Sequence, residues 1–270
     1  MPINTQEILK RIPEDEFKNL DYEIMGQAYK THNDLGRFFE EKIYTALLCE
    51  FLREAGLQHT REFQLRIEHK TFRKAYYIDL LIEGSIPYEL KAVHSLNPAH
   101  DAQLLHYLLL ADLAHGKLVN FRETSVHARY LSTSLIRADR LKHKLHTENW
   151  REEPGTPEIA PILAELLKDW GTHLSIELYK EALCHFLGIG THSLSQLELS
   201  HNGTRLGIAE LPMLNPHTIL HITAIQHASK EHEAYIRRLL HLSQARKAQW
   251  INLGHRIITL TTITDPRLHP

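Results

Sequence analysis

Two carboxylates and a lysine fall on two neighbouring strand-like segments of the chain. The segments AYYIDLLI and IPYELKAV are separated by the tripeptide EGS, which predicts a hairpin loop of three residues with glycine at its tip. With that loop, Asp79 lies opposite Glu89, and Lys91 shares a face with Glu89 because side chains alternate along a strand. Opposed carboxylates about 5 Å apart repel each other, and a divalent cation between them removes that penalty. The spacing therefore favours a Mg²⁺ or Mn²⁺ site, with Lys91 placed to assist hydrolysis of a phosphate ester.

This short pattern has a simpler interpretation. A solvated strand face on which Lys91 neutralises one acid would give the same residues, and such strings are common. Pro87 also bears on the register, because it cannot donate a hydrogen bond to a neighbouring strand. It indicates a sheet edge, a strand start or a bulge, and a bulge would shift the pairing of the acids by one residue.

A third acid precedes the hairpin. The segment LGRFFEEKIYTALLCEFL predicts an amphipathic helix with an apolar residue at every fourth position, namely Leu35, Phe39, Ile43, Leu47 and Phe51. Glu41 lies at the margin of this stripe, in line with Tyr44. A half-buried carboxylate needs a partner, and either Arg37 one turn earlier or a metal ion could supply it. On a later predicted helix, Gln103 and Tyr107 are one turn apart and could contact phosphate or a base, although ordinary helix residues have this spacing too.

The two halves of the sequence repeat one pattern. GRFFEEKIYTALLCEFL, from Gly36, matches GTHLSIELYKEALCHFL, from Gly171, at an offset of 135 residues. A second match, at an offset of 132, aligns Ala92 with Ala224 and Asn120 with Asn252. Each half then reads as helix, three strands, helix and strand, which is the order of an α/β sandwich. We therefore expect a tandem duplication, with one domain at residues 1–148 and a second at residues 149–270.

Composition sets further bounds. Of 270 residues, 43% are hydrophobic and 24% charged, which is typical of a globular protein. The net charge of −2 shows no overall basic field. Neither a signal peptide nor an apolar run long enough for a membrane span is recognised, and two cysteines without a CxxC pair argue against a zinc site or disulfides. We expect a cytoplasmic protein whose Cys49 and Cys184 are buried and reduced.

The residues around the acids resemble the GxxExxY proteins, a branch of the PD-(D/E)xK nuclease superfamily. The resemblance runs from about residue 24 to residue 121 and includes EKIY from Glu41, IDLLIEG around Asp79, YELKAV around Glu89 and PAHDAQLLHYL before KLVNF. It implies a restriction-endonuclease-like α/β/α core with a mixed sheet. In two places the sequence departs from the family pattern, because Phe38 stands where the family has its naming glycine and Arg37 where proline is usual.

The resemblance also implies roles for these residues. Glu41, Asp79 and Glu89 would ligate Mg²⁺ or Mn²⁺, Lys91 would be the catalytic lysine beside Asp79 and Glu89, and Gln103, Tyr107 and Tyr44 would contact substrate. We thus expect a metal-dependent nuclease acting on nucleic acid, DNA more than RNA, either as a monomer forming a pseudo-dimer or as a higher homo-oligomer. The alternative is a non-catalytic nucleic-acid-binding or scaffold protein that keeps the fold.

The second half lacks this set of residues. At the offsets above, Glu41, Asp79, Glu89 and Lys91 are matched by Ile176, Leu211, His221 and Thr223. It therefore reads as a degenerate nuclease-like repeat retained for packing or binding. Basic residues could still line a groove beside the site, or simply form solvated helix faces: Arg137, Arg140, Lys142, Lys144, Arg237, Arg238, Arg246 and Lys247.

Overall fold

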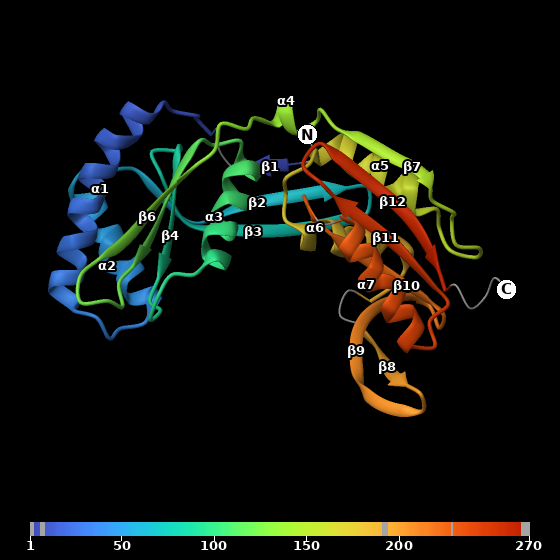
Figure 1. Cartoon of the computed structure of the whole chain (residues 1–270). Coiled ribbons are helices and arrows are strands. Elements are labelled where there is room, and N and C mark those ends of the chain that lie inside the picture. Colours follow the sequence, from blue (N-terminus) through green and yellow to red (C-terminus); the bar gives the residue numbers. More distant parts are fainter. Residues whose placement is uncertain (1–2, 6–8, 191–193, 228, 266–270) are drawn as a thin grey trace. The chain divides into compact units, whose positions relative to one another are not determined.

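The chain folds into two compact units, residues 1–139 (unit 1) and 140–270 (unit 2). The computed structural model describes residues 3–5, 9–190, 194–227 and 229–265; Figure 1 shows unit 1 in blue to green and unit 2 in yellow-green to red. The boundary predicted after residue 148 cuts strand β7 (Lys144–Asn149), which pairs in parallel with the last strand of unit 2. Within the described residues, no helix is long and apolar enough to cross a membrane.

Unit 1 is a six-stranded mixed sheet flanked by helices. Its strands lie in sequence order, and only the pair β4–β5 is parallel. The strands are β1 (Ile3–Thr5), β2 (His59–His69), β3 (Phe72–Ile82), β4 (Ile86–Lys91), β5 (His115–Asn120) and β6 (His127–Ser132). The helices are α1 (Glu14–Leu35), α2 (Glu41–Glu54) and α3 (Pro98–Ala111), and the short α4 (Arg137–Arg140) lies where the units divide.

The helices of unit 1 cover both faces of its sheet. α1 and α2 pack with Tyr88, Leu90 and Val119 in the largest core of the unit. α3 packs its Leu104 on Leu118, whose side chain points to the opposite face of β5 from Val119. This is the predicted α/β/α arrangement, and it places Glu89, one residue from Tyr88 on β4, on the α3 face.

The first helix differs from the prediction. Helical structure is interrupted at Gly36, whose φ of 71° is favourable for glycine, and α2 starts only at Glu41. Phe39, predicted within the apolar stripe, lies in the connecting segment and is 44% exposed. The buried face of α2 is displaced by one residue to Tyr44, Leu48 and Leu52, because this face, rather than the predicted one, meets the sheet.

Unit 2 has the same kind of sheet. Its order is β7-β12-β11-β10-β9-β8. The strands after β7 are β8 (Leu194–His201), β9 (Thr204–Asn215), β10 (Thr218–Thr223), β11 (Lys247–Leu253) and β12 (Ile257–Thr264). The helices are α5 (Ile159–Trp170), α6 (Ile176–Leu187) and α7 (Ser229–Leu242), and α7 packs on the sheet through Ile236 and Leu240.

The two units repeat one topology. The five strands β2–β6 correspond to β8–β12: the first two junctions are antiparallel, the third is parallel and the last is antiparallel in both units. The sixth strand is added at opposite edges, as β1 beside β2 in unit 1 and as β7 beside β12 in unit 2. The predicted repetition of the fold is confirmed at this level.

Equivalent residues make the same contacts in both units. Tyr44 Oη donates to Gly36 O at 2.8 Å, and Tyr179 Oη donates to Gly171 O at 2.6 Å. Each tyrosine thereby fastens the first turn of its helix to the glycine that ends the preceding helix. Cys49 and Cys184, five residues beyond these tyrosines, are both buried and free, as predicted.

A matching pair of asparagines holds the loops that follow β4 and β10. Asn120 accepts from Val93 N at 3.0 Å and donates to Val93 O at 2.8 Å. Asn252 makes the same two contacts with Ile225, at 2.8 and 2.9 Å. The loop that follows Lys91 is therefore held by a contact that the loop after Thr223 shares.

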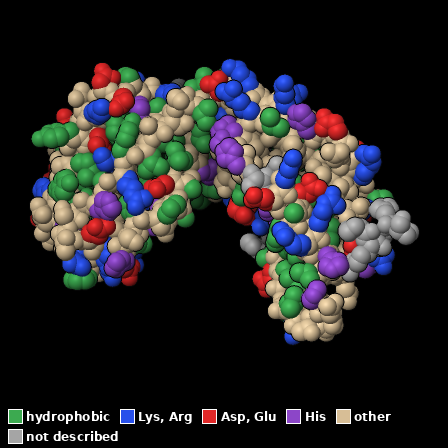
Figure 2. All heavy atoms as spheres, viewed as in Figure 1, with side chains coloured by type: hydrophobic (Ala, Val, Ile, Leu, Met, Phe, Trp, Pro, Cys, Tyr) green, Lys and Arg blue, Asp and Glu red, His purple; other side chains and the backbone are tan. Residues whose placement is uncertain are grey.

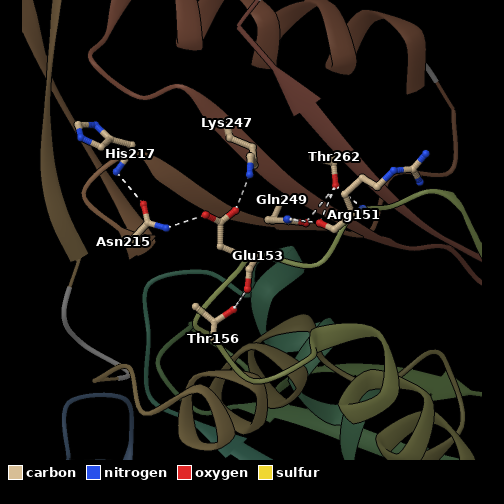
Figure 3. Close-up of polar contacts among 8 residues, drawn as sticks. All are labelled: Arg151, Glu153, Thr156, Asn215, His217, Lys247, Gln249 and Thr262. Atoms are coloured by element: carbon tan, nitrogen blue, oxygen red, sulfur yellow. Dashed lines mark hydrogen bonds and ion pairs between the residues drawn. The ribbon is translucent and has the colours of Figure 1, made fainter. Parts of the chain in front are cut away.

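Unit 2 also has a polar network of its own on the segment before α5. Glu153 accepts from Lys247 Nζ at 2.8 Å and from Asn215 Nδ2 at 2.9 Å, and Gln249 donates to Arg151 O at 2.7 Å (Figure 3). Burial works to raise the pKa of Glu153, but the hydrogen bonds from Lys247 and Asn215 outweigh it and lower that pKa. The network fastens this segment to strands β9 and β11.

Candidate active site

The β3–β4 hairpin brings the predicted carboxylates together. Leu80 pairs with Tyr88, Leu81 with Pro87 and Ile82 with Ile86, so the loop has three residues as predicted. Pro87 lies near the start of β4 and causes no bulge there. The same register continued by one residue sets Asp79 opposite Glu89, and Asp79 Oδ2 accepts from Leu90 N at 2.8 Å.

Lys91 lies between the two acids. Its Nζ is 2.7 Å from Glu89 Oε1 and 3.8 Å from Asp79 Oδ2. The Glu89 side chain is only 1% exposed, whereas that of Asp79 is 27% exposed. The site therefore has a buried floor at Glu89 and opens to solvent on the side of Asp79.

Helix α3 lies beside Glu89 and contributes two side chains to the site. Gln103 Nε2 donates to Glu89 Oε1 at 2.7 Å and to Tyr107 Oη at 3.0 Å. α3 starts with an Asn97 cap, whose side chain accepts from the backbone of Ala99 and His100. The one-turn spacing of Gln103 and Tyr107 thus places both side chains on the face that meets Glu89.

Glu41 approaches from the first turn of α2. Burial is the main cause that raises the pKa of its carboxyl, and Lys91, Asp79 and the backbone N–H of Ala92 are the other groups that act on that pKa. Arg37, the other partner considered for Glu41, forms no ion pair with it within the described part of the chain. Glu41 therefore faces the hairpin acids, as its position on the helix indicated.

The pKa shifts of the hairpin acids follow from crowding away from water. Burial, and then the charge of Asp79, raise the pKa of Glu89 to about 7. Burial also raises the pKa of Asp79, against the opposing effects of Lys91 and the Leu90 N–H. Burial works to lower the pKa of Lys91, but Glu89 and Asp79 outweigh it and raise that pKa. The site thus favours additional positive charge.

One oxygen of the floor has no partner. Glu89 Oε1 accepts from Lys91 and Gln103, whereas Glu89 Oε2 is buried without a hydrogen bond among the described residues. A buried carboxylate oxygen in that state is costly, and a divalent cation with oxygen ligands would satisfy it. The donor set of Glu89, Asp79 and Glu41 therefore fits Mg²⁺ or Mn²⁺ chemically.

The acids do not form a ready-made metal cage in the structure. Nowhere in the described residues do three side chains of the ligating types lie close enough to hold one ion. The Lys91 ammonium lies 2.7 Å from Glu89 Oε1 and 3.8 Å from Asp79 Oδ2. The observed arrangement is one in which the lysine compensates the acids.

Tyr44 is fully buried and is not available to substrate, contrary to the role expected from the sequence. Its ring is fully buried, stacks on Phe121 with 4.7 Å between centroids, and uses its hydroxyl to hold Gly36. Its position three residues after Glu41 puts it on the inner face of α2. Tyr44 therefore orients the helix that carries Glu41.

The structure adds an acid that the sequence motif did not reveal. Glu62 lies opposite Asp79 on β2, between the pairs Arg61–Leu80 and Phe63–Ile78, and its charge raises the pKa of Asp79. Its φ of 48° is in the left-handed region, which is unusual for a strand residue other than glycine. Only the β2–β3 register could have identified it.

The predicted basic groove is not supported at three of its residues. Arg140 is 1% exposed and donates to Trp170 O, Lys247 pairs with Glu153, and Arg237 pairs with Glu233. Figure 2 shows basic and acidic side chains interspersed over the visible face, without a continuous basic stripe. These three charges stabilise unit 2 internally.

Comparison with known proteins identifies a similarity at the level of a superfamily. Residues 18–131, which lie within unit 1, match the family model described as the PD-(D/E)XK nuclease superfamily. This span holds α2, the β3–β4 hairpin and α3, and therefore every residue of the site. The match indicates a nuclease, and hence a hydrolase acting on nucleic acid, as the class of protein to which this unit is similar. No curated protein and no solved structure matches the chain.

Proposed function

We propose that unit 1 is a Mg²⁺- or Mn²⁺-dependent nuclease that hydrolyses phosphodiester bonds, with DNA as its preferred substrate, and that it belongs to the GxxExxY branch of the superfamily. One observation carries the proposal: Glu89, almost fully buried, leaves Oε2 unpartnered beside Asp79 and Lys91. Asp101, paired with Arg129, also leaves Oδ1 unpartnered, but at Glu89 the charges of Asp79 and Glu41 act on the same carboxylate. The superfamily match over the same residues supports this interpretation.

The side chains divide the work. Glu41, Asp79 and Glu89 would hold the divalent ion, which when bound supplies Lewis-acid stabilisation of the phosphate and lowers the pKa of water. Lys91, held by Glu89, is placed to donate to a phosphate oxygen as negative charge develops. Gln103 fixes Glu89 Oε1 and is itself oriented by Tyr107, so both act as positioning residues. Unit 2, which lacks these acids, would serve as a non-catalytic copy.

The test is a cleavage assay on single- and double-stranded DNA and RNA, with Mg²⁺, with Mn²⁺ and with EDTA. Wild-type protein is expected to cleave DNA only with metal, and Asp79→Asn and Lys91→Ala are expected to be inactive but folded. Thr223→Ala, at the position that matches Lys91 in unit 2, is the control and should cleave normally. Metal-independent cleavage, or full activity of Asp79→Asn, would refute the proposal. A protein that binds nucleic acid without cleaving it would favour the scaffold alternative.

A further inference from the structure

An exposed aromatic ring with two arginines lies next to the site. Phe38 is 74% exposed, in the segment between α1 and α2. The guanidinium carbon of Arg37 is 5.1 Å from the centroid of its ring, and that of Arg122 is 5.6 Å away. We call Phe38, Arg37 and Arg122 the ring platform. Phe38 thus keeps most of its surface exposed although two guanidinium groups lie over its ring.

The two arginines have no acidic partner of their own. Throughout the described residues, neither guanidinium group forms an ion pair with a carboxylate. Glu123, beside Arg122 in sequence, is instead paired with His127 at 2.7 Å. The positive charge of the platform is therefore free to meet an anion from outside.

The backbone places the platform beside the acids. Phe38 precedes Glu41 by three residues, so their Cα atoms are at most about 11 Å apart. Arg122 follows Phe121, whose N–H donates to Lys91 O at 2.9 Å. Both members therefore lie at the end of the parallel pair β4–β5 where Lys91 also lies.

Unit 2 keeps the fold here but not the platform. At the offsets of the repeat, Arg37, Phe38 and Arg122 are matched by Thr172, His173 and Gly254. His173 stacks instead on His255, with 4.4 Å between ring centroids, and Thr172 hydrogen-bonds His255 O. The platform thus occurs in the unit that carries the acids and is absent from the one that lacks them.

We propose that the ring platform stacks an unpaired nucleobase of the substrate, with Arg37 and Arg122 holding the flanking phosphates, so that unit 1 prefers single-stranded or frayed nucleic acid. An aromatic face accepts any base, and guanidinium groups contact both bases and phosphates. A base inside a duplex has no free face for such stacking. This inference rests on the proposed function for its substrate class and adds strand preference to it.

The test is metal-free binding, so that its outcome does not depend on cleavage. Single-stranded DNA carrying one 2-aminopurine, the same strand in a blunt duplex, and a strand with an abasic site are titrated in EDTA at low salt. Phe38→Ala and Phe38→Leu are expected to weaken single-strand binding roughly tenfold. Phe38→Tyr should bind single strands as wild type does, because it keeps the aromatic ring. Duplex affinity should not change. Arg122→Ala should reduce the slope of log K against log salt by about 0.7.

Tyr22→Ala is the matched control, since Tyr22 is a ring 83% exposed with no cation over it among the described residues. Equal binding by Phe38→Ala and wild type, no binding by wild type, or equal loss in Phe38→Ala and Phe38→Tyr would overturn the inference. So would a change of oligomeric state in Phe38→Ala with unchanged DNA binding, because the ring would then contact protein. A protein that binds through Phe38 but never cleaves would contradict only the proposed function.

Discussion

The two units fill one strand position with opposite chemistry. Glu89 on β4 and His221 on β10 are 132 residues apart and pair in the same way with the parallel strand that follows. Burial is the first cause of both shifts: it raises the pKa of Glu89 to about 7 and lowers that of His221 to about 4. The fold therefore supplies a pocket that disfavours charge, and the side chain decides what that pocket does.

The neighbours of the two residues extend the contrast. Around Glu89 stand further acids and a lysine, whereas His221 Nε2 meets His232 Nε2 at 2.7 Å and the two rings stack. Trp250 Nε1 donates to Thr223 Oγ1, which occupies the position of Lys91. Unit 2 thus replaces a charged cluster with a neutral, hydrogen-bonded one. The equivalent hydrogen bonds of Asn120 and Asn252 show that the two clusters lie in the same backbone framework.

The largest expected effect is on the cleavage rate, and it should distinguish Glu89 in unit 1 from His221 in unit 2. Glu89→Gln should reduce metal-dependent cleavage at least about 100-fold, because it removes a ligand charge and weakens the hold on Lys91. His221→Asn should leave the rate unchanged, since unit 2 carries no acids at that position. Initial rates at saturating Mn²⁺, with melting curves to confirm folding, measure both. Equal losses in the two variants would contradict the assignment of chemistry to unit 1.

Opposite pH trends should distinguish the two positions in metal-free protein. The folded state binds the Glu89 proton more tightly than the unfolded chain, so this group loses its stabilising effect as the pH rises from about 4.5 to 7. The pKa of His221 is lowered from 6.5, so its site loses stability as the pH falls from 6.5 to about 4. Each effect is on the order of 3 kcal/mol.

Thermal unfolding in EDTA from pH 4 to pH 8 measures these trends. Glu89→Gln should remove the loss of stability with rising pH between about 4.5 and 7, and His221→Asn the gain of stability with rising pH between about 4 and 6.5. Loss of both slopes in a single variant, or of neither slope in either variant, would show that other groups set the profile.

The equivalent hydrogen bonds of Asn120 and Asn252 predict similar losses of stability when either asparagine is removed. Asn120→Ala and Asn252→Ala each remove two hydrogen bonds to the backbone of one residue, Val93 or Ile225, and one further hydrogen bond, from Arg122 N or Thr223 Oγ1. Each should lower the free energy of unfolding by about 2 kcal/mol, measured by urea denaturation. Only Asn120→Ala should also reduce cleavage, because it loosens the loop that follows Lys91. A catalytic loss in Asn252→Ala would show that unit 2 takes part in the reaction.

The smallest effect concerns the tyrosines. Tyr44→Phe and Tyr179→Phe each remove one hydrogen bond to a glycine carbonyl, and Tyr44→Phe also removes the acceptor of the Phe39 N–H; each substitution should cost on the order of 1 kcal/mol. Because Tyr44 is buried, its loss should not change affinity for single-stranded DNA in the metal-free binding assay. A marked loss of affinity would restore Tyr44 as a substrate-contacting residue.

The hairpin and the repeat could be predicted because short-range rules determine them. A three-residue loop fixes the register that opposes Asp79 to Glu89, and repeated glycine, tyrosine and asparagine positions mark equivalent elements. The helix break at Gly36 could not be seen, since an apolar residue at every fourth position continues through it. The position of Glu62 opposite Asp79 could not be predicted either, because it depends on strand pairing. The contacts of Lys91 with both Glu89 and Asp79 depend on side-chain placement in space.

Binding of Mn²⁺ tests the central claim most directly. Calorimetric titration of metal-free wild-type protein should reveal a Mn²⁺ site that Asp79→Asn abolishes and His221→Asn leaves intact. We expect this result because Glu89 in unit 1 leaves a buried oxygen without a partner beside Asp79, whereas unit 2 has Leu211 and His221 at the matching positions. No binding by wild-type protein, or undiminished binding by Asp79→Asn, would contradict it.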